Sequence, residues 1–140
     1  MLVKNTIRVG VALCALASLT VSAFASSVSG IWHGHINFDT TKLPTVTDAN
    51  QRKAMLAQIK TQEAIKITLT LKTDGNFSMI TLGGPKQNAP VTGTYKVKGS
   101  NLEIQPMKAG KPGPTRSFTI SKDSHTLSFV QGPVTVTFGK

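Results

Sequence analysis

Two histidines, His33 and His35, lie two residues apart and are the first candidates for chemistry in the chain. On a β-strand, side chains two apart leave the same face, so both imidazoles could share a metal ion with His125 as a third ligand. The alternative is that both rings are hydrated or pack beside a neighbouring element. Because no acidic or thiol ligand lies near them in the sequence, we expect neither a metal nor another cofactor.

A second combination joins one arginine to aromatic side chains. Arg116 stands two residues before Phe118, so on a strand the guanidinium would leave the same face as this ring. In a concave apolar site, Arg116 and the Tyr95 hydroxyl would anchor an anionic ligand beside Phe118 and Phe129. The alternative is that the strand begins at Ser117 and that Arg116 is a hydrated residue of the rim. The predicted ligand-binding residues are therefore Tyr95, Arg116, Phe118 and Phe129.

The six acidic residues do not form a catalytic pair in the sequence. The four aspartates occupy predicted turn or helix-cap positions, which explain them locally, and the two glutamates are isolated. The chain has no Gly-x-Ser-x-Gly, no His-Glu-x-x-His and no phosphate-cradling glycine loop. We therefore expect that the protein is not an enzyme.

Period-two alternation of apolar residues predicts the elements that would position these side chains. Strands are predicted at residues 29–38, 65–72, 77–82, 91–98, 102–104, 118–120, 127–129 and 134–138. Residues 48–62 change to a helical period, and Asp48 followed by Gln51 fits a capping box. Ile80 and Leu82 point away from the barrel interior, unlike Phe77 and Met79 on the same strand. We therefore expect the helix to cover the outer face of this strand.

Eight short strands with one inward face close most economically as a barrel, because closure removes exposed edges. The predicted fold is mainly β, an eight-stranded antiparallel up-and-down barrel with one helix inserted between strands 1 and 2. A two-sheet sandwich is the alternative. A barrel of this size is either filled by side chains or holds one small ligand, and the sequence leaves both open.

The first 25 residues have the pattern of a cleaved signal peptide. Lys4 and Arg8 precede an apolar run at 9–19, and small residues stand just before a cleavage point after Ala25. A retained anchor is the alternative, but the run is shorter than the ~20 residues that span a bilayer. We expect a secreted or periplasmic protein whose domain is residues 26–140, without a transmembrane segment after processing.

Loss of residues 1–25 removes the single cysteine, Cys14, and two of the 16 basic residues. The remaining 14 basic residues exceed the six acidic ones by eight, which favours anionic neighbours. Many lysines alternate with apolar residues, as solvent-facing lysines on strands do, so solubility explains them as well. No aromatic residues interleave a basic stripe, which excludes nucleic acid. We expect a monomer, and an anionic envelope surface remains a candidate partner.

The segment Ser29-Gly30-Ile31-Trp32 resembles the Gly-x-Trp opening of lipocalins and related calycins. The segments 69–77 and 93–97 look like hairpin segments of small secreted bacterial lipocalin-like domains of unassigned function. The resemblance implies that Gly30 and Trp32 plug the closed end of the barrel. Lipocalins commonly lay an arginine across this tryptophan, and here only Lys140 is cationic near the final strand. That strand also lacks the arginine and tyrosine of fatty-acid-binding relatives, so fatty-acid carriage is not implied.

These patterns lead to one functional expectation and two alternatives. We expect a secreted, non-catalytic binding domain that takes a small apolar or amphiphilic molecule at the barrel mouth. A protein-interaction module is the first alternative, since the opening also resembles secreted inhibitors of metalloproteases. Here only Ser26 to Ser29 precede Gly30, and the disulfide of those inhibitors is missing. The second alternative is a cationic binder of envelope polymers.

Overall fold

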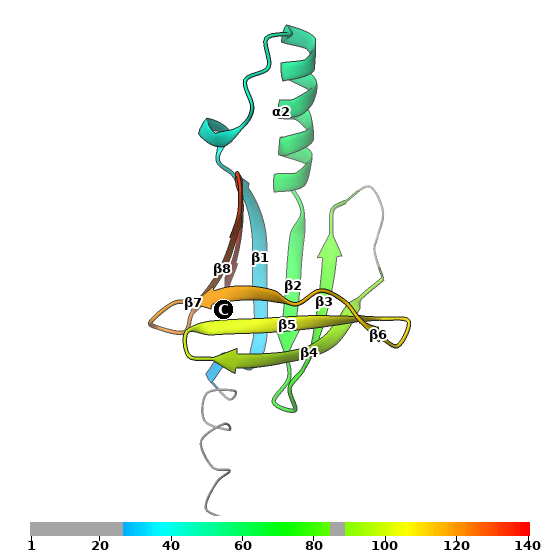
Figure 1. The fold of residues 1–140 in the computed structure, drawn as a ribbon, viewed down its shortest axis with the longest axis vertical. Helices are drawn as coiled ribbons and strands as arrows, with labels where there is room; N and C mark the ends of the chain where they lie inside the picture. Colours follow the sequence, from blue (N-terminus) through cyan, green and yellow to red (C-terminus); the bar gives the residue numbers. More distant parts are fainter. Residues whose placement is uncertain (1–26, 85–88) are drawn as a thin grey trace, which may run out of the picture.

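A computed structural model of the chain describes residues 27–84 and 89–140. These residues form a closed eight-stranded antiparallel β-barrel with one helix between the first two strands, as the sequence predicts (Figure 1). The predicted signal peptide, residues 1–25, lies outside the described residues.

The barrel is an up-and-down arrangement in which each strand pairs with the next strand of the ring. Strand β9 returns to pair with β1, and the pairing of β4 with β5 completes the ring. The ring strands are β1 (Gly30–Phe38), β2 (Lys66–Leu71), β3 (Asn76–Leu82), β4 (Val91–Lys98), β5 (Asn101–Lys108), β7 (Arg116–Ile120), β8 (Thr126–Gln131) and β9 (Val134–Gly139). A two-residue strand, β6 (Lys111–Pro112), turns back beside β5.

The interior follows from the alternation of the strands. Residues directly opposite in an antiparallel ladder share a face, and Trp32 lies opposite Leu69, as Leu127 lies opposite Phe138. All four are buried. One continuous core results, made of Val28, Trp32, Leu69, Leu71, Phe77, Tyr95, Leu102, Ile104, Phe118, Ile120, Leu127 and Phe138.

Trp32 closes the end of the barrel at which β1 begins. Its indole Nε1 donates a hydrogen bond to the carbonyl oxygen of Val28 at 2.8 Å, and the ring is fully buried. The Lys140 ammonium lies 5.3 Å from the ring centroid and donates to the Ser27 carbonyl at 3.1 Å. Lys140 thus takes the place where the resemblance led us to look for an arginine.

Gly30 is required at this closed end for two reasons. Its φ of +130° is a conformation that residues with a Cβ rarely adopt. A Cβ at this position would also lie 2.9 Å from Cε of Lys140. A larger residue would therefore displace the lysine from the face of Trp32.

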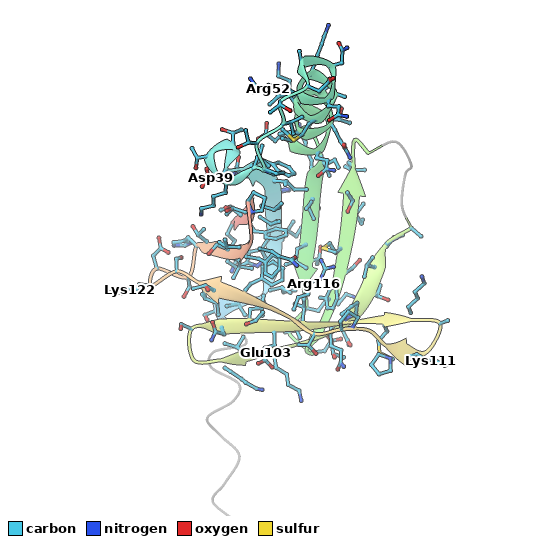
Figure 2. The ribbon with its side chains drawn as sticks, turned by 45° about the horizontal axis from the view of Figure 1, so that its top comes forward. Asp39, Arg52, Glu103, Lys111, Arg116 and Lys122 are labelled. Carbon is cyan, nitrogen blue, oxygen red and sulfur yellow. The ribbon has the colours of Figure 1, made fainter. Side chains whose placement is uncertain are left out.

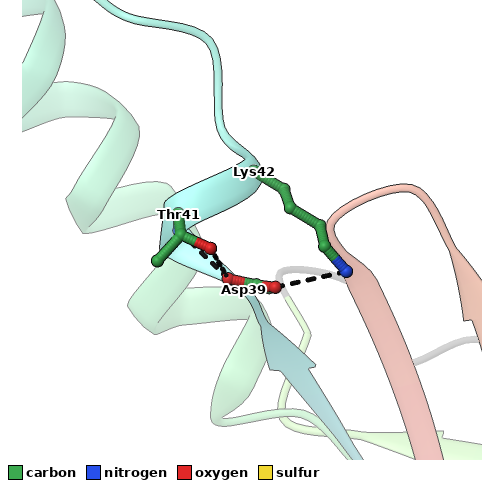
Figure 3. Close-up of polar contacts among 3 residues, drawn as sticks. All are labelled: Asp39, Thr41 and Lys42. Carbon is green, nitrogen blue, oxygen red and sulfur yellow. Dashed lines mark hydrogen bonds and ion pairs between the residues drawn. The ribbon is translucent and has the colours of Figure 1, made fainter.

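A short turn leads out of β1 at the opposite end. Asp39 precedes the 3₁₀ turn η1 (Thr40–Lys42) and accepts hydrogen bonds from the Thr41 amide at 3.1 Å and the Thr41 hydroxyl at 2.5 Å (Figure 3). Lys42 Nζ lies 3.3 Å from the same carboxylate. The hydrogen bonds from Thr41, with a smaller contribution from Lys42, lower the pKa of Asp39. These contacts fix the direction in which the chain leaves the barrel.

The helix α2 (Ala49–Glu63) begins where the capping pattern predicts it. The Asp48 carboxylate accepts hydrogen bonds from the amides of Asn50 at 2.8 Å and Gln51 at 2.9 Å. At the other end of the helix, the Phe38 amide donates to Glu63 Oε1 at 3.3 Å, and α2 packs against β1. The helix is thus tied to the end of the barrel that lies away from Trp32.

The predicted covering of β3 by this helix is wrong. Helix α2 stands beyond the end of the barrel (Figure 1), and Ile80 and Leu82 remain 39% and 45% exposed. Only residues 64 and 65 separate α2 from β2, so the chain cannot reverse and lay the helix over the neighbouring strand.

Candidate functional site

The barrel has one sealed end and one open end. Several apolar side chains on the interior face at the open end are only partly buried, and we call five of them the mouth cluster: Ile36, Ile67, Met79, Phe129 and Val136. Toward the closed end, most interior residues are almost completely buried, and Val97 is partly buried. Apolar surface inside the barrel therefore meets solvent at the open end.

The strand registers place the mouth cluster on one shared surface. Ile36 lies opposite Val136, which in turn lies opposite Phe129 on the next strand. Leu69 is a fully buried interior residue. Ile67 stands two residues before it on β2, and Met79 lies opposite it on β3. Since opposite residues share a face, all five side chains point into the barrel.

Arg116 lies on the same interior face, at the rim. Strand β7 begins at Arg116 rather than at Ser117, and Arg116 pairs opposite the buried residue Ile104. The side chain is exposed, whereas Phe118 two residues further along the strand is buried. Figure 2 labels Arg116 on the ribbon. Arg116 therefore stands at the edge of the interior face, with its side chain in contact with water.

Phe118 and Phe129 meet inside the barrel. Their ring centroids are 5.5 Å apart, and Phe118 also contacts Phe138 with centroids 5.7 Å apart. The ladder between β7 and β8 pairs only Thr119 with Ser128 and Ile120 with Leu127. Beyond these two pairs toward the open end, Phe118 and Phe129 link the two strands through their ring contact.

Tyr95 and Arg116 share the interior face, each opposite Ile104 of β5, but the Tyr95 hydroxyl points elsewhere. Its ring is buried in the core, and its hydroxyl donates a hydrogen bond to the Lys72 carbonyl at 2.5 Å, next to the turn at the closed end of β2. Burial, and to a lesser degree the negative charge of Asp74, raises the pKa of this phenol. The structure thus brings Phe118 and Phe129 into contact and places Arg116 two residues before Phe118 on the same face of β7, while the Tyr95 hydroxyl is held at the Lys72 carbonyl.

His33 and His35 project outward from β1 and are exposed. His35 lies opposite Lys66 on β2. Within residues 27–84 and 89–140, no three side chains of His, Cys, Asp or Glu converge as a metal site requires.

The alternation in the sequence predicts that Ile36, Ile67, Met79 and Val136 face inward, but it does not identify them as the residues of the mouth. Their depth along the barrel axis depends on the register between strands far apart in the chain. Knowledge that Trp32 pairs with Leu69 at the closed end would have fixed the register of β1 and β2, and with it the depth of Ile36 and Ile67.

Comparisons of this chain with protein-family models, with curated proteins and with solved structures found no match. None of the helices among the described residues combines the length and the apolar character needed to cross a membrane. The geometry of the barrel is therefore the basis for the function proposed below.

Proposed function

We propose that this protein is a secreted or periplasmic, non-catalytic binding domain of the lipocalin-like type, and that its ligand is a small amphiphile with an anionic head. The apolar part of the ligand would lie on the mouth cluster, and the head would contact Arg116. Phe118 and Phe138, deeper in the barrel, would form the floor of the site.

The half-exposed mouth cluster is the observation that carries this proposal. A barrel that holds no ligand is more stable when side chains fill both of its ends, as they fill the closed end around Trp32. Here the interior face instead presents partly exposed aliphatic, thioether and aromatic groups with one cation at their edge. Apolar walls with a single polar anchor are typical of small-molecule sites.

The proposed mode of binding predicts a dependence on the length of the apolar chain. Each buried methylene contributes about 0.8 kcal/mol, or roughly a fourfold gain in affinity. The gain should stop once the chain reaches the floor at Phe118 and Phe138, because their edge-on contact closes the interior there.

The first test is native mass spectrometry of the protein purified from its own host, which should show a co-purified molecule. The second is calorimetric titration with decanoate and decanol, which share an apolar chain and differ in charge. Phe129→Ala should weaken binding of both probes about tenfold. Arg116→Gln should weaken binding of decanoate by up to about fivefold and leave binding of decanol unchanged, since an exposed ion pair contributes at most about 1 kcal/mol.

Lys122→Gln is the matched control, because Lys122 is an exposed cation in the turn before β8, at the closed end. It should change neither affinity. The proposal would be overturned if Phe129→Ala bound each probe as tightly as wild type does and no molecule co-purified with the protein.

A further inference from the structure

The outer face of α2 carries a stripe of basic and small apolar residues. The stripe lines an open groove of about 510 Å³ together with Thr47, and its positions follow the helical repeat: Ala49, Arg52, Lys53, Leu56, Ala57 and Lys60. These six residues, the α2 stripe, include three cations and no acidic residue.

The rest of the protein gives this helix little support. Ile59 is its only buried residue, and Leu56 in the middle of the stripe is 41% exposed. A helix of 15 residues is marginal in water without packing. Helix α2 contacts β1, and Arg52 of the stripe reaches the segment that precedes the helix, whereas Lys53 and Lys60 are exposed.

Charge is distributed unevenly between the two ends of the molecule. In the described part of the chain, the open-end half has eight cations and three acidic residues: Lys42, Arg52, Lys53, Lys60, Lys66, Lys108, Lys111 and Arg116 against Asp39, Asp48 and Glu63. The closed-end half has five cations and three acidic residues: Lys72, Lys96, Lys98, Lys122 and Lys140 against Asp74, Glu103 and Asp123. The net charges are therefore +5 and +2.

We propose that the α2 stripe docks on the surface of a bilayer that contains anionic lipids. Three cations in a stripe that itself contains no acidic residue complement a layer of anionic head groups. Leu56 and the two alanines would contact the boundary between head groups and acyl chains. Since Leu56 is the only large apolar residue of the stripe, the helix would lie at head-group depth, and electrostatic attraction would dominate.

Docking through α2 would deepen the proposed function, because it holds the open end of the barrel near the surface from which an amphiphile is taken. Ile80 and Leu82, on the outer face of β3, are exposed toward the same end of the barrel. The docking itself depends on Lys53 and Lys60 and not on the mouth cluster, so the two proposals can fail separately.

Lys53 and Lys60 are the residues to change, since Arg52 also donates a hydrogen bond to the Val46 carbonyl at 2.9 Å. Sedimentation with vesicles of phosphatidylcholine, with and without phosphatidylglycerol, measures docking. Each cation beside an anionic surface raises the partition coefficient about fivefold. The double variant Lys53→Gln/Lys60→Gln should therefore bind anionic vesicles about 25-fold more weakly than wild type.

The matched control is Lys72→Gln/Lys122→Gln, which removes the same charge from exposed positions at the closed end. It should retain most of the binding. Wild-type binding should be absent on pure phosphatidylcholine and should decline between roughly 0.1 M and 1 M salt, as the Debye length falls from about 10 Å to about 3 Å. Amide hydrogen exchange in α2 should slow on anionic vesicles.

Equal loss in the two double variants would overturn the proposal, because it would assign the effect to overall charge. Binding to neutral vesicles, or slower exchange in the barrel without a change in α2, would also overturn it. Decanoate titration of Lys53→Gln/Lys60→Gln should match wild type, so failure of docking and failure of ligand binding remain distinguishable.

Discussion

Gly34 shows how closely the chain approaches itself inside the barrel. A Cβ at this position would lie 2.5 Å from Cδ1 of Phe138, a core ring that cannot move far because it also contacts Phe118. We expect Gly34→Ala to lower the free energy of unfolding by about 1–3 kcal/mol, the usual cost of overpacking. Urea denaturation followed by the fluorescence of Trp32 measures the loss.

Gly139→Ala is the control for this substitution, since a Cβ added at Gly139 would meet no atom within 4 Å. It should change the free energy of unfolding by less than about 0.5 kcal/mol. Equal effects of the two substitutions would show that β1 and β9 do not meet as described.

Tyr95 predicts a dependence of stability on alkaline pH. Burial raises the pKa of its phenol above 10, so the unfolded chain releases this proton first as pH rises. The stability that the protonated Tyr95 phenol contributes is fully present below about pH 10 and is lost as pH rises through the pKa of the folded state. Between about pH 9 and about pH 11, wild type should lose more stability than Tyr95→Phe.

At neutral pH, Tyr95→Phe should cost about 1 kcal/mol, because the hydroxyl no longer donates to the Lys72 carbonyl. Tyr95 is the only tyrosine, so its ultraviolet absorbance follows the phenol directly. A phenol that titrates at its ordinary pKa in the folded protein would contradict its burial.

Among the elements, α2 is the one whose stability depends most on local interactions, since it buries only Ile59. Asp48→Ala removes the acceptor of two helix amides and should cost about 1 kcal/mol, concentrated in α2. Hydrogen exchange should show faster exchange in α2 and unchanged exchange in the barrel. Asn50→Ala, which keeps the cap, should leave both unchanged.

The elements differ in how far the sequence predicts them. The strands and the helix are confirmed, because alternation and the Asp48 cap are local signals. The position of α2 relative to β3 was missed, since it depends on the two-residue connection at 64–65. Residues 107–114, which lack a clear alternation, extend β5 to Lys108 and add β6, because pairing of Met107 with Thr92 continues the ladder.

At the scale of the whole molecule, features that depend on closure could not be predicted from the sequence. Lys140 reaches the face of Trp32 only because β9 pairs with β1, which brings residues far apart in the chain together. The same closure sets the depth of Ile67 and Val136 in the barrel. Local alternation predicts which side chains face inward, and only the complete ring determines which of them reach the open end.

The two ends of the molecule therefore differ in structure. The closed end is sealed by Trp32 and Lys140, whereas the open end combines a partly exposed apolar interior, Arg116 and the projecting helix. The proposals for ligand binding and for surface docking both assign function to the open end.

Methyl-detected NMR during a decanoate titration tests ligand binding at the open end most directly. Binding in the barrel mouth predicts saturable shifts at the methyl groups of Ile36, Ile67, Met79 and Val136, with Val28 and Leu127 at the closed end unchanged. Shifts confined to residues outside the barrel, or no saturable shift in the mouth cluster, would contradict it.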